Sequence, residues 1–190
     1  MSARKGTLTV ISGPMFSNKS GELLRLATVH RIAGREVALF KHSLDDRYEG
    51  PAHISTHGGA SMAAEPVATS QEISLLATGA GVVAIDEAQF FADDLVTVAA
   101  QLVTGGTTVF IAGLDRNFKG EPFGPMPALM AMADDVMKLK AVCMRCRSLN
   151  GTMTQRLIGG RPASRNSPVI QVGAAEAYEA RCRDCHEVPD

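Results

Sequence analysis

The chain has 190 residues, of which 45% are apolar and 21% charged, and its formal net charge is −1. This composition is typical of a globular protein with its own core, and the near-neutral charge gives no general attraction to nucleic acid or to anionic membranes. Because no apolar run is long enough to cross a bilayer and the first residues carry no export signal, we expect a cytoplasmic protein. Its four cysteines should then be thiols or metal ligands rather than disulfides.

The first motif lies near the N-terminus, where residues 7–24 read TLTVISGPMFSNKSGELL. A short β-branched run ends at a Ser-Gly-Pro turn, and an apolar-periodic helix begins at a Lys-Ser pair. Helix N-termini attract anions, a lysine adds a point charge for phosphates, and a serine hydroxyl can hold Mg²⁺. We therefore predict a phosphate-binding loop, although a Gly/Ser-rich turn without a ligand is the alternative. The predicted loop consists of Gly13, Pro14, Met15, Phe16, Ser17, Asn18, Lys19 and Ser20. Asn18 stands where the usual pattern has glycine.

Helical and strand-like segments alternate along the next part of the chain. We expect helices at residues 19–33, 70–78, 92–104 and 126–133, with Gly34 closing the first and Ser70 capping the second. Strands are expected at residues 7–11, 36–42, 81–88, 107–112 and 136–142. Residues 43–65 show no periodicity and are interpreted as a long loop, which is either functional or a surface excursion. Such alternation predicts a parallel sheet covered by helices on both faces, with ligands bound at the carboxyl ends of its strands.

Two acidic residues, Asp86 and Glu87, follow the apolar run GVVAI. A carboxylate fixed at a strand end is suited to organising Mg²⁺ beside a phosphate site, and its neighbour could accept a proton from an attacking hydroxyl. The simpler interpretation is that acidic residues mark the start of a loop. Because the phosphate loop and Asp115 are also predicted at strand ends, we favour the functional interpretation.

The cysteines form two C-x-x-C pairs, Cys143 with Cys146 and Cys182 with Cys185. Four thiolates in this arrangement suit a closed, tetrahedral structural zinc site, whereas a redox pair or unrelated buried cysteines are the alternatives. His186 adjoins the last cysteine and could replace it as a ligand, but we expect the four cysteines. The short segments around them indicate a small second unit. We predict an α/β domain at residues 1–142 and a zinc-binding domain at residues 143–190.

Five motifs occur in one order: GPMFSNKS, DEAQFF, AGLDRNFKGEPFG, KLKAVCMRC and VGAAEAYEARCRDCH. Together they closely resemble the zinc-containing thymidine kinases, the cytosolic class with a RecA-like P-loop fold, over nearly the whole chain. The resemblance implies transfer of the ATP γ-phosphate to the 5′-hydroxyl of thymidine, with Mg²⁺ as the catalytic ion and Zn²⁺ as a structural one. It also implies a homotetramer that is inhibited by dTTP and has no nucleic-acid or membrane partner.

The resemblance also implies roles for individual residues. Glu87 matches the general base, Asp86 the residue that organises Mg²⁺ together with Ser20, and Arg47 a phosphate or transition-state contact. A zinc-held "lasso" loop, residues 151–178 here, covers the nucleoside in this family. The positions that match nucleoside-enclosing residues are Met15, Phe90, Leu114, Phe118, Phe123, Thr154, Val169, Gln171 and Tyr178. Without the resemblance, core packing would be the preferred interpretation of the three phenylalanines.

Three positions depart from the family pattern: Asn18 in the phosphate loop, and Gln171 and Ala174 in the lasso. Asparagine tolerates a left-handed backbone better than most residues, so the loop is expected to form, although the side chain could crowd the phosphates. Asn18 motivates one alternative, a RecA-like ATPase or nucleotide-binding protein with weakened kinase activity. The cysteine pairs alone motivate another, a zinc-ribbon nucleic-acid binder, against which the near-neutral charge argues.

Overall fold

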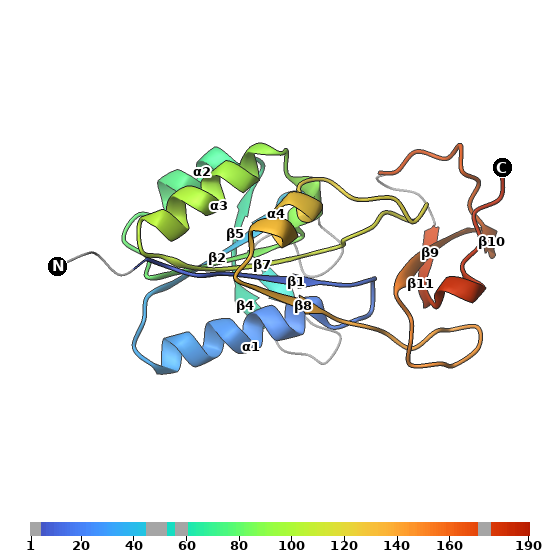
Figure 1. Cartoon of the computed structure of the whole chain (residues 1–190), viewed down its shortest axis with the longest axis horizontal. Helices are drawn as coiled ribbons and strands as arrows, with labels where there is room; N and C mark the ends of the chain where they lie inside the picture. Colours follow the sequence, from blue (N-terminus) through green and yellow to red (C-terminus); the bar gives the residue numbers. More distant parts are fainter. Residues whose placement is uncertain (1–4, 45–52, 56–60, 171–175) are drawn as a thin grey trace.

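The computed structural model describes residues 5–44, 53–55, 61–170 and 176–190. Within them the chain forms a parallel six-stranded sheet, a small antiparallel sheet nearer the C-terminus and a two-stranded ribbon (Figure 1). The predicted α/β class with helices on both faces of a parallel sheet is therefore confirmed. None of the helices in the described part has the length and apolar character needed to cross a membrane.

The large sheet has the strand order β5-β2-β6-β7-β1-β8. All its pairings are parallel, so the carboxyl ends of its strands point to one edge. Its strands are β1 (Leu8–Ser12), β2 (Val37–His42), β5 (Glu65–Val67), β6 (Val82–Asp86), β7 (Thr108–Gly113) and β8 (Asp135–Lys138). The central strand β6 is buried at every residue, as its continuous apolar run predicts for a strand covered on both faces.

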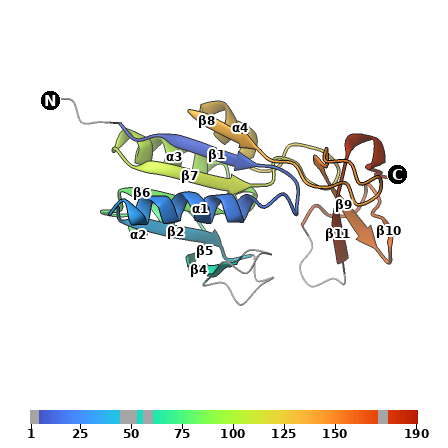
Figure 2. The same ribbon diagram turned by 90° about the horizontal axis from the view of Figure 1, so that it is seen from below.

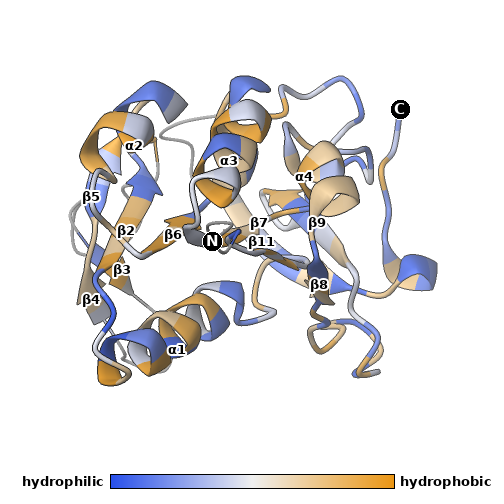
Figure 3. Ribbon diagram, turned by 60° about the vertical axis from the view of Figure 1, so that its left-hand side comes forward, coloured by the Kyte–Doolittle hydropathy of each residue, from blue (hydrophilic) through white to orange (hydrophobic). Residues whose placement is uncertain are grey.

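Helices cover both faces of this sheet (Figures 2 and 3). Helix α1 (Lys19–Ile32) packs on one face through Leu23, Leu24 and Ala27, against the side chains of alternate sheet residues. The other face carries α2 (Ser70–Leu76), α3 (Asp94–Thr104) and α4 (Met126–Met132). The result is a three-layer body with two apolar cores separated by the sheet.

The prediction that residues 43–65 form a loop is partly wrong. It contains β3 (His53–Ser55) and β4 (Ser61–Ala63), which pair as an antiparallel ribbon. The chain then enters β5, which joins the edge of the large sheet beside β2. Three-residue strands show no periodicity, and Pro66 at the centre of β5 argues against a strand except at a sheet edge, where a missing N–H is tolerated.

Two boundary predictions also need correction. Helix α2 is capped by Thr69 and not by Ser70: the Thr69 hydroxyl accepts from the Glu72 N–H at 3.4 Å, and the Glu72 carboxylate accepts from the Thr69 N–H at 2.8 Å. Strand β8 ends at Lys138, four residues before the predicted end. The chain makes one more bond to β1, from the Leu139 N–H to the Ser12 carbonyl, and then leaves the sheet toward the cysteines.

The C-terminal unit is built on β9 (Met153–Ile158), β10 (Arg161–Pro162) and β11 (Glu176–Arg181), in the order β10-β9-β11. A short 3₁₀ turn, η2 (Arg183–Cys185), follows. The segment predicted as a lasso loop, residues 151–178, therefore contains β9 and β10 and ends within β11. The domain boundary at residues 142 and 143 remains a prediction.

Candidate active site

The predicted phosphate loop connects the end of β1 to the start of α1. Gly13 has a φ of +151°, and a Cβ there would lie 2.6 Å from the Leu139 carbonyl oxygen and 2.8 Å from Ser17 Oγ, so only glycine fits. Ser17 Oγ donates to the Pro14 carbonyl at 2.8 Å. Lys19 Nζ donates to the same carbonyl at 2.8 Å, which folds its ammonium back over the loop. The side chains of Ser17 and Lys19 therefore both stabilise the turn through the Pro14 carbonyl.

Asn18 occupies the glycine position of the loop pattern with a left-handed backbone (φ 64°, ψ 33°). This is a conformation that asparagine adopts more readily than most residues, so the helix starts in the expected register. The Asn18 amide lies over the first turn of α1: a Cβ added to Gly21 would come within 2.2 Å of Asn18 Oδ1. Gly21 therefore leaves the space that the Asn18 side chain occupies.

The carboxyl end of β6 brings Asp86 against the start of α1. Asp86 is buried and its Oδ1 accepts from the Glu87 N–H at 2.9 Å, and the Ser20 hydroxyl lies close enough to its side chain to favour the ionised form. Burial and the neighbouring Glu87 charge raise the pKa of Asp86 to about 7, against the opposing effects of the Ser20 hydroxyl and the Lys19 charge. A carboxylate and a hydroxyl are oxygen donors of the kind that Mg²⁺ prefers, so these two residues fit a magnesium ion.

Glu87 follows in a left-handed conformation with φ 54°, unusual for a non-glycine residue. Its Oε2 accepts from Gln89 Nε2 at 2.5 Å, and Gln89 Oε1 accepts from the Leu114 N–H at 2.9 Å. Gln89 lies within the motif DEAQFF, but no role for it is predicted from the sequence. Its partner Leu114 is 25 positions away, so no local pattern indicates the contact.

The aromatic residues of the predicted nucleoside site fall into two places. Phe90, in the 3₁₀ turn η1 (Ala88–Phe90), packs edge-on against Phe123 with ring centroids 5.9 Å apart. Phe118 is buried, and the Arg156 guanidinium lies over its ring at 5.1 Å. Leu114 is 9% exposed and follows the end of β7. All of these residues come from the carboxyl-end edge of the sheet or from β9.

Thr154 links the C-terminal unit to the phosphate loop. It lies on β9, and its Oγ1 accepts from the Met15 N–H at 3.0 Å. Tyr178, on β11, is the register partner of Arg156, whose Nη1 donates to the Pro168 carbonyl at 2.5 Å. Val169 adjoins that carbonyl and is half-buried. The predicted residues Arg47 and Gln171, and Ala174, lie outside the described residues.

The four cysteines converge, as predicted. Their sulfur atoms all lie within 4.8 Å of one another, and Cys146 Sγ is 3.7 Å from Cys182 Sγ. Zinc–sulfur bonds of about 2.3 Å give tetrahedron edges of about 3.8 Å, so the thiols fit a zinc ion. Although burial opposes ionisation, backbone hydrogen bonds from Cys146, Cys182 and Arg145 lower the pKa of Cys143 to about 6. Hydrogen bonding to Cys182 raises the pKa of Cys185 to about 12.

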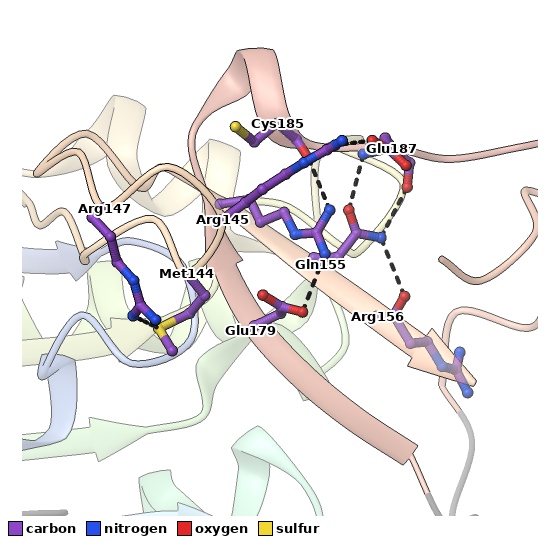
Figure 4. A network of polar contacts seen from close by, with 9 residues as sticks. Met144, Arg145, Arg147, Gln155, Arg156, Glu179, Cys185 and Glu187 are labelled. Atoms are coloured by element: carbon purple, nitrogen blue, oxygen red, sulfur yellow. Dashed lines mark hydrogen bonds and ion pairs between the residues drawn. The ribbon is translucent and has the colours of Figure 1, made fainter. Parts of the chain in front are cut away.

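The residues after the cysteines fasten this unit to the sheet body. His186 Nε2 donates to the Phe118 carbonyl at 2.8 Å, so this nitrogen serves the Phe118 loop and not the cysteine cluster. Gln155 is fully buried and exchanges two hydrogen bonds with the Glu187 backbone, both at 2.9 Å (Figure 4). Gly120 completes the contact, because a Cβ there would meet Met153 Cε at 2.9 Å. The cysteine cluster is thereby connected to the Phe118 loop through His186, the residue after Cys185.

Because Asn18 packs against Gly21, we predict that Gly21→Ala changes stability in opposite directions depending on whether residue 18 is asparagine or glycine. In the natural chain, Gly21→Ala must displace the Asn18 amide and should destabilise the fold by roughly 1–2 kcal/mol. In an Asn18→Gly background, the same alanine should stabilise α1 by about 0.5–1 kcal/mol, because alanine is the better helix former. Chemical denaturation of the four proteins measures both values. Equal effects in the two backgrounds would show that the side chains do not interact.

Metal content should depend on each cysteine. We expect one zinc ion per chain, and Cys146→Ser should lower zinc occupancy and the melting temperature, because a serine hydroxyl is a poor zinc ligand. Met144→Ser, an exposed change in the same turn, is the matched control and should retain the metal. Elemental analysis and thermal melts with and without a chelator provide the measurement. Full zinc content in Cys146→Ser would contradict a four-cysteine site.

The thymidine kinase family model matches residues 6–186 of the chain. Among solved structures, the flagellar accessory protein FlaH from Methanocaldococcus jannaschii is 15% identical, with a TM-score of 0.48 over 84% of this chain and 76% of that chain. A similarity this distant does not indicate the fold or the function of this chain. The family match, by contrast, takes in the phosphate loop, the end of β6 and all four cysteines. The chain therefore belongs to the thymidine kinase family.

Proposed function

We propose that the protein is a thymidine kinase that transfers the γ-phosphate of ATP to the 5′-hydroxyl of thymidine, giving dTMP and ADP. The observation that carries this proposal is the meeting of the start of α1 with the end of β6, where the Ser20 hydroxyl and the Lys19 charge both act on the buried Asp86 carboxyl. Membership of the thymidine kinase family supports the kinase reaction class.

In this proposal the loop at residues 13–20 binds the ATP phosphates. The N-terminus of α1 follows this loop, and helix N-termini attract anions; Lys19 brings a positive charge to the same loop. Ser20 and Asp86 would hold Mg²⁺, which neutralises phosphate charge when bound. Occupation of that site requires the Asp86 carboxylate to be ionised, and a cation beside it favours the ionised form. Arg47 is proposed to add a further positive contact at the transferred phosphate.

Glu87 is proposed as the general base for the 5′-hydroxyl. Its carboxylate is held by Gln89 next to the strand end that carries Asp86, so base and magnesium site share one short segment. Phosphoryl transfer depends mainly on position and charge neutralisation, so a fixed base close to the loop is sufficient.

The nucleoside is proposed to lie between the sheet edge and the C-terminal unit. Met15 supports this arrangement, because its N–H already contacts Thr154 of β9 at 3.0 Å. The proposed enclosing residues are Met15, Phe90, Leu114, Phe118, Phe123, Thr154, Val169, Gln171 and Tyr178. Zinc bound by the four cysteines would hold β9 and β11 in place and would supply no reaction chemistry, since four thiolates leave no open position.

Three further features belong to the same proposal. Residues 1–142 and 143–190 act as a catalytic domain and a zinc-binding, nucleoside-covering domain. The protein works as a cytoplasmic homotetramer in thymidine salvage. It is inhibited by dTTP, whose thymine and triphosphate would use the nucleoside and phosphate subsites together.

The test is phosphate transfer from γ-labelled ATP with Mg²⁺ to a panel of nucleosides. We expect labelled dTMP from the wild-type protein and a fall in kcat of about 10²–10⁴-fold in Glu87→Gln, because the amide cannot accept the proton. Glu36→Gln, an exposed change before β2, is the matched control and should keep wild-type turnover.

ATP binding should survive in Glu87→Gln, which separates loss of catalysis from loss of fold. A wild-type protein that phosphorylates no deoxynucleoside would overturn the proposal. ATP hydrolysis that thymidine does not change would instead support the ATPase alternative raised by Asn18.

A further inference from the structure

Gln89 is a buried polar residue beside the proposed base, with an exposed fraction of 2%. It sits in the 3₁₀ turn that follows β6, two residues after Glu87. Both ends of its amide are used: Nε2 donates to Glu87 Oε2 at 2.5 Å, and Oε1 accepts from the Leu114 N–H at 2.9 Å. The side chain therefore joins the segment after β6 to the segment after β7.

The partners determine which way the amide points. An ionised carboxylate can only accept a hydrogen bond and a backbone N–H can only donate one. The amide nitrogen must consequently face Glu87 and the amide oxygen must face Leu114, because the flipped amide would put like groups together at both ends. Glutamine is the one common side chain of this length that supplies a donor and an acceptor in a single planar group.

Two glycines allow the residue to fit. A Cβ at Gly113 would lie 2.8 Å from Gln89 Oε1, and a Cβ at Gly124 would lie 2.4 Å from the Gln89 carbonyl oxygen. The chain thus approaches Gln89 closely from the end of β7 and from the segment before α4. A side chain enclosed this tightly has little freedom to turn, so its two hydrogen bonds fix the positions of their partners.

We propose that Gln89 is a positioning residue that sets the general base and one wall of the nucleoside site together. This inference rests on the proposed function for its roles of Glu87 and Leu114. The Glu87 backbone is in a left-handed conformation that glutamate rarely adopts, and the bond from Gln89 anchors the carboxylate that this backbone carries. Through the Leu114 N–H, the same amide anchors the residue proposed to contact the nucleoside.

Gln89→Glu tests the two ends of the amide separately. The new carboxylate can still accept from the Leu114 N–H, but it cannot donate to Glu87 and it places a second negative charge there. We expect kcat to fall by roughly 100-fold or more while KM for thymidine changes less than about threefold. Gln89→Met, which removes both bonds without adding charge, should lower kcat and also raise KM for thymidine.

The swapped pair Glu87→Gln/Gln89→Glu tests the contact without reference to activity. In it the new amide at position 87 can donate to the new carboxylate at position 89, which still accepts from Leu114. The melting temperature should recover relative to Gln89→Glu, although phosphate transfer stays lost because no base remains. Gln155 is an equally buried glutamine with two bonds to the Glu187 backbone. Gln155→Glu is the matched control, and adding Glu87→Gln to it should bring no recovery.

The outcomes separate this inference from the proposed function. If the wild-type protein is an active kinase but Gln89→Glu keeps wild-type kcat, or the swapped pair melts no higher than Gln89→Glu, Gln89 does not position Glu87. If the wild-type protein is inactive but the swapped pair recovers in melting temperature, the contact stands and the proposed reaction is at fault. Should Gln89→Glu fail to fold, Gln89→Met provides the kinetic comparison, and unchanged kcat and KM in it would overturn the inference.

Discussion

The approach of the Ser20 hydroxyl to the buried Asp86 carboxyl is the contact on which the candidate site depends. Ser20 lies in the first turn of α1, which follows β1, and Asp86 closes β6, two strands away from β1 in the sheet. The two meet only because all six strands run in one direction and end at one edge. Burial of a carboxyl group at that edge is unfavourable for its charged form, and the raised pKa of Asp86 records this cost. A cation at the site would relieve it, which is why the pair is suited to phosphate chemistry.

The C-terminal unit is positioned by its contacts with the loops at the carboxyl-end edge of the large sheet. Thr154 bonds to the phosphate loop and His186 bonds to the Phe118 loop, so contacts with the sheet body help to fix a unit too small for a large core. The cysteine cluster lies at the same end of these strands, because Cys182 follows Arg181, the register partner of Met153, and the Met144 N–H donates to the Ala180 carbonyl. Loss of the metal is therefore expected to loosen Phe118 and Thr154 without touching the phosphate loop directly.

The parts of the fold that sequence predicts are those with strong local signals. Continuous apolar runs identify β6 and β7, and the Lys-Ser pair identifies the start of α1. Strand β5 is not predicted from the sequence, because it is three residues long and centred on Pro66. It forms a strand only through its pairing with β2. The cap of α2 is misplaced by one residue because Thr69 and Ser70 both carry hydroxyls. Gln89 is missed for a deeper reason: its bond to Leu114 is created by tertiary packing, which no local pattern encodes.

A single site at the sheet edge, shared by both units, is proposed to hold ATP and thymidine together. A crystal structure with thymidine, Mg²⁺ and a non-hydrolysable ATP analogue tests it most directly. We predict the triphosphate on the loop at residues 13–20, thymine between Leu114 and β9, and the 5′-hydroxyl about 3 Å from the Glu87 carboxylate. Thymidine bound away from Glu87, or a triphosphate bound away from Ser20 and Asp86, would contradict the account.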